Sequence, residues 1–305
     1  MPKDLHELPK LRDSISYLYV EHAVIEQEDS SIIMIREDGR IPVPIASTTC
    51  LMLGPGTSVT HAAVKAAAEN GCMIAWCGEQ GSRFYASGMG ETRSAENLLL
   101  QARLCMDTQA HLAVVRRMFE RRFPSLPTAD MTLRQIRGLE GIRMKQTYKT
   151  ESKRTGVKWY TRNYKQTSWE ASDDINRALS GANAILYAVC HAAIVSLGFS
   201  PGLGFVHTGK LLSFVYDIAD LYKAETSIPA AFEAVRDQKG DLDRLVRENT
   251  RKKIRNAGIL KRTAEDIAWI FDVPLTAENH NMDYAGDLWD EEGSLPGGLN
   301  YGGEQ

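Results

Sequence analysis

The sequence predicts an α+β fold, with a small β-rich N-terminal domain followed by a larger all-α C-terminal domain. Strand-like apolar runs and a hairpin turn dominate residues 1–86, whereas helical spacing dominates residues 94–275. Residues 87–93 are small and polar, which predicts a linker. Residues 276–305 are rich in glycine, asparagine and acids, and we expect this acidic tail to be flexible when nothing is bound.

Short apolar runs predict the strands of the first domain. Residues 15–20 form one run, and residues 32–45 hold two runs joined by Asp38 and Gly39, a pair typical of hairpin turns. Residues 72–76 are apolar throughout, which indicates a buried strand. The domain is therefore expected to be built from short strands.

One short helix interrupts these strands. Residues 54–56 read Gly-Pro-Gly and break the chain, after which Thr57 or Ser58 can cap an Ala-rich segment. This segment is expected to end near Asn70 and Gly71, because both residue types favour the conformation that closes helices.

Helical spacing fills the second domain. Ser94 can cap a helix that continues to Phe123, where Pro124 stops it. Thr132 and Gln135 form a capping box at the start of the next helix. Further helices are predicted at residues 173–197, 211–222, 229–237, 242–255 and 262–271.

The helix after Thr132 carries a carboxylate on a partly apolar face. Ile136, Glu140, Met144 and Thr147 share one stripe at helical spacing. A surface helix more often places its acids opposite such a stripe. Glu140 therefore either extends to water or is held there for chemistry, and the pattern leaves both readings open.

The composition indicates a globular protein. A chain of 305 residues with 43% hydrophobic content can bury a sizeable core. It has no run of eighteen apolar residues and begins with a polar segment, so we expect no membrane span, no export and a cytoplasmic location. Its five cysteines are an odd number without a CxxC pair, which favours small core residues over disulfides or a zinc ribbon.

Charge is distributed unevenly along the chain. The net charge is −3, but residues 276–305 hold seven acids and no lysine or arginine, so the rest of the chain is net positive. Residues 244–262 hold eight lysines or arginines against the single acid Glu248. Such a basic run allows polyanion binding, and the alternative is a solvated basic helix paired with surface acids.

The segment from Gly204 to Lys223 brings together groups that can bind a metal. Asp217 and Asp220 are three residues apart on a predicted helix, so they project from one face, and His207 lies just ahead in a Gly-rich turn. Two carboxylates and one imidazole suit a hard divalent ion such as Mg²⁺ or Mn²⁺. The competing interpretation is a solvated acidic helix face with a hydrogen-bonded histidine.

Several motifs together resemble one protein family. RGLEGIR contains Glu140, GFVHTGK contains His207, and FVYDIAD contains Asp217 and Asp220. With MLGPGTSVTHAAV and RFYASG, these motifs resemble the CRISPR-associated integrase Cas-one (Cas1) in its type I-E form. The resemblance runs from about Ile15 to about Phe271.

The resemblance implies a metal-dependent endonuclease and integrase that inserts new spacer DNA into a CRISPR array. Family metal ligands match Glu140, His207 and Asp220, and Asp217 matches a further acidic position needed for activity. The family implies homodimers, two of which are bridged by a dimer of the small protein Cas-two (Cas2). Its DNA partners are double-stranded fragments with single-stranded 3′ ends and the CRISPR leader-repeat. His207 has an open alternative as a general acid, although we favour the ligand role.

DNA contacts are expected from several further residues. Tyr164 and Trp169 stand among polar residues and can offer ring faces to unpaired bases, unless they are ordinary core aromatics. The remaining positions, which the resemblance places at or near DNA, are Arg83, Tyr187, Lys210, Tyr216, Lys223, Arg244 and Arg247. For Arg83 the alternative is a strand cap, and for Arg244 and Arg247 it is the solvated basic helix.

Two rival functions use the same residues differently. A repair or processing nuclease would hydrolyse branched DNA at the same metal site without integration, because water and a 3′-hydroxyl attack the same polarised phosphate. A noncatalytic scaffold would hold DNA on its basic face while the acids cap helices. Metal dependence and strand transfer separate the three functions.

Overall fold

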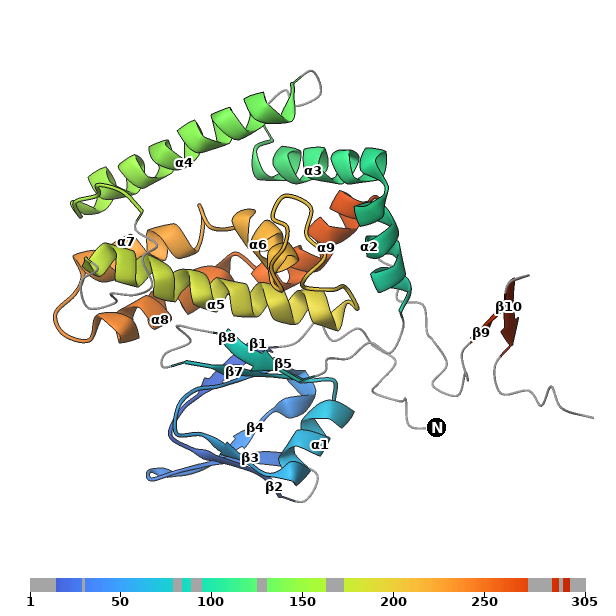
Figure 1. The fold of residues 1–305 in the computed structure, drawn as a ribbon. Coiled ribbons are helices and arrows are strands. Elements are labelled where there is room, and N and C mark those ends of the chain that lie inside the picture. The colour runs from blue at the N-terminus through green and yellow to red at the C-terminus, as the bar shows by residue number, and fades with distance from the viewer. Residues whose placement is uncertain are drawn as a thin grey trace, which may run out of the picture. The chain divides into compact units, whose positions relative to one another are not determined.

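The computed structural model has strands in its N-terminal part and helices in most of the remainder (Figure 1), which confirms the predicted α+β class. It describes residues 15–28, 31–78, 84–88, 95–124, 131–162, 173–273, 287–290 and 293–296. Two compact units are present, one of Lys10–Leu275 and one of Met1–Pro9 with Thr276–Gln305. The predicted linker at residues 87–93 lies mostly outside the described residues.

The N-terminal strands form two four-stranded sheets, with strand orders β1-β5-β7-β8 and β4-β3-β2-β6. In the first sheet β1, β5 and β7 run parallel and β8 pairs antiparallel with β7. The predicted hairpin joins β3 to β4, but its two turn residues are Glu37 and Asp38, and Gly39 already pairs with Arg36 as the first residue of β4. The strands are β1 Ile15–Val20, β2 Val24–Glu28, β3 Ser31–Arg36, β4 Gly39–Val43, β5 Thr48–Leu53, β6 Ser58–Val59, β7 Met73–Cys77 and β8 Phe84–Ser87, with a 3-10 turn at Ile45–Ser47.

Helix α1, His61–Glu69, covers a core between the sheets. Ile25, Ile32 and Leu51 are fully buried there and pack with Ala67 of α1. The prediction of its cap was wrong, because Thr60 accepts a hydrogen bond from the backbone N–H of Ala63, whereas the segment at Ser58 belongs to β6.

The helical part contains α2 to α9. The predicted helix from Ser94 to Phe123 is in fact two helices, because Asp107 leaves the helical conformation and caps the second one through the N–H of Ala110. The capping box of Thr132 and Gln135 is present. The helices are α2 Glu96–Met106, α3 Thr108–Arg122, α4 Leu133–Thr155, α5 Asp174–Ser196, α6 Ser213–Asp220, α7 Ser227–Arg236, α8 Leu242–Asn256 and α9 Ile259–Phe271.

Helix α5 is the central helix of this part, and α6, α7, α8 and α9 all contact it. Among the described residues, its segment Asp174–Val195 is the one helix apolar and long enough to cross a membrane, yet 78% of that window is buried inside the fold. Ala188 and Ala192 pack against Met52 and Met73 of the first sheet. The apolar character of α5 is therefore explained by core packing.

The cysteines are unpaired, and the acidic tail contains two paired strands. All five cysteines are free thiols, and four of them are buried, as their spacing predicted. Within the tail, β9 Asp287–Asp290 pairs antiparallel with β10 Gly293–Pro296, and Leu288 is the register partner of Leu295. The sequence had indicated no regular structure there.

Candidate active site

The loop before α6 approaches the helix very closely at Gly204. A Cβ atom at this position would clash with the carbonyl oxygen of His207 and with Ser213, so only glycine fits. Gly209 closes the same loop with a φ of 79°, a conformation that favours glycine. The sequence GFVHTG thus folds into a tight turn that presents His207 beside α6.

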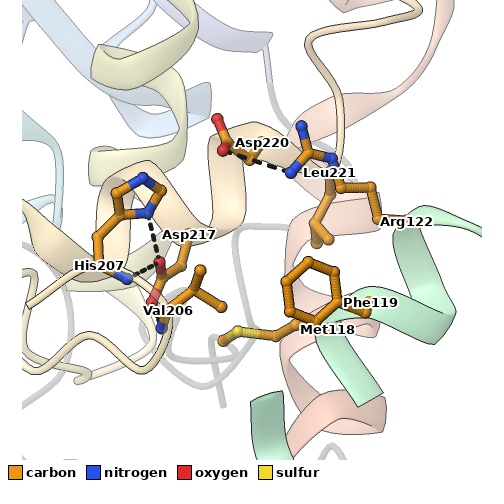
Figure 2. Close-up of a pocket in the computed structure, with 8 residues that line it drawn as sticks. All are labelled: Met118, Phe119, Arg122, Val206, His207, Asp217, Asp220 and Leu221. Atoms are coloured by element: carbon orange, nitrogen blue, oxygen red, sulfur yellow. Dashed lines mark hydrogen bonds and ion pairs between the residues drawn. The ribbon is translucent and has the colours of Figure 1, made fainter. Parts of the chain in front are cut away.

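Asp217 fixes this turn from within α6. Its carboxylate is buried and accepts hydrogen bonds from the backbone N–H groups of Phe205, Val206 and His207 at 2.6, 3.1 and 2.8 Å. The ring Nδ1 of His207 lies 2.8 Å from Asp217 Oδ1 (Figure 2), which leaves Nε2 as the ring nitrogen free of this contact. Asp217 therefore orients His207, as carboxylates behind metal-binding histidines commonly do.

This contact also changes the protonation of His207. The hydrogen bond to Asp217 raises the pKa of His207 above its ordinary value, and the nearby charge of Asp220 acts in the same direction. The imidazole side chain is 44% exposed, so it reaches solvent while its partner does not.

Asp220 is the last residue of α6, one turn beyond Asp217. Burial alone would raise the pKa of Asp220, but the charges of Lys223 and then Arg122 outweigh it and lower the pKa. Lys223 Nζ lies 2.5 Å from Asp220 Oδ1, and this ion pair outweighs burial to raise the pKa of Lys223. Asp220 is thus held as a carboxylate.

Glu140 reaches the same region from α4. Its carboxylate forms an ion pair with Arg122 Nη1, and the same nitrogen lies 3.5 Å from Asp220 Oδ2. Arg122 Nη2 also lies 3.3 Å from the Sδ of Met144, so the predicted stripe of α4 faces this arginine. Of the two readings of Glu140, the structure supports a carboxylate held in place rather than one extended to water.

His207, Asp217, Asp220 and Arg122 line one pocket (Figure 2), and Glu140 reaches it through its ion pair with Arg122. Its walls are Met118, Phe119, Arg122, Val206, His207, Asp217, Asp220 and Leu221. Within the described part of the chain, no three His, Cys, Asp or Glu side chains already stand together as a metal-binding group. Instead, a guanidinium stands between Glu140 and Asp220. The donor set still fits a divalent cation, because the Arg122 guanidinium already places positive charge between the two carboxylates and the imidazole of His207 lies near Asp220.

Aromatic residues predicted to lie near DNA surround the same loop. The rings of Tyr187 and Tyr216 meet edge to face at 5.1 Å, and Tyr216 lies 5.9 Å from the ring of His207. Lys223 lies over Tyr187 at 5.0 Å, which makes it part of this cluster, whereas Lys210 is exposed on the loop. The structure therefore groups Tyr187, Tyr216 and Lys223 with the acids.

Arg244 and Arg247 lie on α8 in different environments. The side chain of Arg244 is 59% exposed and pairs with Glu248. That of Arg247 is only 15% exposed, pairs with Glu21 at 3.1 Å and lies over the ring of Tyr19. Arg247 thus joins α8 to the N-terminal sheet, while Arg244 faces solvent.

Three predicted residues cannot be compared, because Arg83, Tyr164 and Trp169 lie outside the described residues. One site residue, Arg122, was missed by the sequence analysis. Its only local signal is its place beside Pro124, at the predicted end of a helix, and nothing in that pattern points toward acids on two other helices.

The comparisons with known proteins agree with this fold. The family model for CRISPR associated protein Cas1 matches residues 16–125 and 120–258. A CRISPR-associated endonuclease Cas1 from Thermus thermophilus is 50% identical over 99% of this chain and 94% of its own length. The Escherichia coli K12 protein of that name is 42% identical, over 90% of this chain and 89% of its own.

Solved structures give the same result. A structure of TtCas1 in complex with DNA superposes with a TM-score of 0.82 at 50% identity, covering 93% of this chain and all of that one. A casposase bound to its integration product shares the fold, with a TM-score of 0.65 at 13% identity, over 85% of this chain and 91% of its own. The fold and pocket define a two-part α+β protein with an acidic and imidazole site. The chain belongs to the Cas1 family.

Proposed function

We propose that this protein is a metal-dependent DNA endonuclease and integrase that inserts spacer DNA into a CRISPR array. The observation that carries the proposal is that Asp220 and His207 line one pocket whose Arg122 also pairs with Glu140. A buried carboxylate, that of Asp217, orients His207. Similarity to proteins named CRISPR-associated endonuclease Cas1 supports the nuclease chemistry. The likeness to TtCas1 bound to DNA supports DNA as the ligand.

Glu140, His207 and Asp220 would hold Mg²⁺ or Mn²⁺, with oxygen and imidazole donors. When bound, the ion would polarise the phosphate, activate the attacking 3′-hydroxyl and stabilise the leaving oxygen. Asp217 contributes by fixing the ring of His207. Its carboxylate contacts Nδ1, so Nε2 is left as the nitrogen that would coordinate the ion. The low pKa of Asp220 keeps that ligand ionised.

The aromatic cluster beside the site is suited to holding the reacting strand. Tyr187 and Tyr216 offer ring edges and faces next to His207, and Lys210 and Lys223 add positive charge. Arg244 is exposed on the basic helix and suits a phosphate contact. We assign Arg83, Arg247, Tyr164 and Trp169 to the DNA-binding set as expectations that the sequence raises.

The assembly proposed for this chain follows its family. We infer a type I-E Cas1 that acts as a homodimer in the cytoplasm, with two dimers bridged by a Cas2 dimer. The DNA substrates are fragments with single-stranded 3′ ends and the CRISPR leader-repeat. Insertion joins the fragment's 3′ oxygen to a repeat phosphorus and releases a 3′-hydroxyl on the array, so that no bond is lost overall.

The test is an integration assay with a supercoiled plasmid that carries a CRISPR array. The purified protein is incubated with a labelled fragment, with and without Cas2, and with Mg²⁺ or a chelator. Label in the array that requires both Cas2 and metal supports the proposal. Metal-dependent cutting of branched DNA without any transfer of label would select the processing nuclease, and metal-independent binding alone would select the scaffold.

A further inference from the structure

Arg122 is the residue that joins the two halves of the acidic site. It ends α3, and its side chain is only 10% exposed. Its Nη1 contacts Glu140 of α4 and lies 3.5 Å from Asp220 of α6. Its Nη2 lies 3.3 Å from Met144, and its guanidinium lies over the ring of Phe123 at 5.2 Å. Three helices therefore meet at one guanidinium.

The neighbouring cation cannot take over this bridging contact. Lys223 pairs with Asp220 and lies over Tyr187, and the described ion pairs do not connect it to Glu140. The ion pairs of Arg122 link Glu140 with Asp220. Without Arg122 two carboxylates from separate helices would face each other and repel.

The same two carboxylates are the acidic ligands in the proposed function, on which this inference rests. A divalent ion held by both would occupy the space where the guanidinium now stands. We propose that Arg122 is a positioning residue: it holds Glu140 and Asp220 together before the cation binds, and the cation then displaces it. The flexible arginine stem and the Phe123 ring allow the side chain to withdraw while its charge stays near the pocket.

Two opposing effects decide how Arg122 changes metal affinity. Holding the carboxylates together favours the ion, because fewer side chains must be ordered when it binds. Competition disfavours the ion, because charge-assisted hydrogen bonds in a nearly buried site must first be broken. Ordering the carboxylates costs only the entropy of a few side-chain rotations. Competition is a larger free-energy cost, because a full positive charge must leave the position of the ion. Competition is therefore the larger effect.

The Arg122→Gln variant removes the competing charge from the site. It should bind Mn²⁺ at least about tenfold more tightly than the wild type, equivalent to about 1.4 kcal/mol. Arg122→Lys keeps the positive charge but lacks the two parallel N–H groups that can join two carboxylates. Its Mn²⁺ affinity should therefore lie between those of the wild type and Arg122→Gln. Arg143→Gln is the matched control, because Arg143 also lies over the Phe123 ring, at 5.1 Å. It should leave Mn²⁺ affinity within about twofold of wild type, because it alters the same ring contact and keeps the Arg122 guanidinium in the site.

The affinities are measured with full-length protein, by the loss of the free Mn²⁺ electron paramagnetic resonance signal on titration. A second measurement needs only wild-type protein with isotope-labelled arginine. The Nη signals of Arg122 should be in slow rotation in metal-free protein and become averaged when Mg²⁺ saturates the site. This second measurement decides the question if Arg122→Gln fails to fold. A fixed structural ion pair would keep its slow signals at every Mg²⁺ concentration.

The outcomes separate this inference from the proposed function. If wild type binds Mn²⁺ and Glu140→Gln abolishes binding, the metal site stands. Unchanged affinity in Arg122→Gln, or unchanged Arg122 signals with Mg²⁺, would then overturn the displacement alone. If the wild type shows no Mn²⁺ binding that depends on Glu140 or Asp220, both the metal site and the displacement of Arg122 are disproved. Tighter binding in Arg122→Gln with averaging of the wild-type signals supports displacement.

Discussion

Asp217 Oδ1 contacts two groups of the same residue, the backbone N–H and the ring Nδ1 of His207, each at 2.8 Å. The carboxylate therefore determines both the path of the loop and the orientation of the ring. Because it is buried and also accepts from Phe205 and Val206, no solvent molecule can easily replace it.

The Asp217→Asn variant should be unstable as well as inactive. An amide has one acceptor oxygen and adds donors opposite backbone N–H groups, so at least one buried donor loses its partner. We expect the free energy of unfolding to fall by about 3 kcal/mol, measured by urea denaturation. Thr208→Ala, in the same loop and exposed, is the control and should remain within about 0.5 kcal/mol of wild type. A stable Asp217→Asn protein would contradict the anchoring role.

Removing a single proposed ligand should abolish strand transfer and spare DNA binding. Alanine at Glu140, His207 or Asp220 removes one donor from the ion, which typically contributes several kcal/mol of charge stabilisation in the transition state. Phosphate contacts elsewhere supply the affinity, so fragment binding should remain within about threefold. Integration is measured by label transfer to the array and binding by fluorescence anisotropy. Wild-type integration by Asp220→Ala would disprove the metal site.

The arginines Arg244 and Arg247 should give different results when changed singly. Arg244→Ala should lower the slope of log affinity against log salt by roughly 0.9 if it contacts one phosphate. Arg247→Ala breaks the pair with Glu21 and the contact with Tyr19, so it should also reduce the free energy of unfolding by about 2 kcal/mol. Salt titration and urea unfolding measure the two effects. An Arg244→Ala slope equal to wild type would favour the solvated-helix interpretation.

The folded protein should lose stability in mild acid because of the buried His191. Burial lowers the pKa of His191 to about 4, whereas an unfolded histidine titrates near 6.5. Between these values the unfolded state binds more protons, so stability is full above about 6.5 and falls as the pH drops towards 4. His191→Asn should reduce this slope by as much as about 1.4 kcal/mol per pH unit. Urea unfolding of the wild-type and His191→Asn proteins at several pH values measures the two slopes.

Deleting the acidic tail from Thr276 onward should weaken binding to Cas2. Its seven acids would be repelled by DNA phosphates, and a two-stranded hairpin, the pairing of β9 with β10, gains stability in water by packing on another surface. Leu288, Trp289 and Leu295 are the expected apolar anchors. Isothermal titration with purified Cas2 measures the effect, and cutting of branched DNA by the shortened chain alone should be unchanged. If the shortened chain binds Cas2 with unaltered affinity and integrates normally, the tail has no role in Cas2 binding.

Local signals in the sequence predicted much of the fold. The hairpin near Asp38 and the Thr132 capping box each depend on a few neighbouring residues, and both are present, with the hairpin turn one residue earlier than predicted. Strand β5 was not predicted, because it is recognised only through its pairing with β1 and β7, far along the chain. The helix break at Asp107 was missed although its cap is local, because the apolar spacing continued across it.

The candidate site was only partly predictable for the same reason. The spacing of Asp217 and Asp220 indicated one helix face, yet the structure gives the two carboxylates different surroundings: backbone N–H groups for Asp217 and cations for Asp220. That difference arises from how the loop folds over α6. Arg122 depends on the packing of α3 against α4 and α6, which no local pattern contains.

The weak burial of α4 has a consequence for how the site loses its shape. Of the residues of α4, all of which are described, only Ile136 is buried, while Glu140 depends on this helix for its position. Segments with few buried contacts open at a lower free energy than the whole molecule. The site can therefore disassemble by release of one helix while α5 and its neighbours stay folded. The fraction of molecules with an assembled site is therefore set by the equilibrium between packed and released α4. Ligands that bridge α4 and α6 would shift this equilibrium toward the packed state.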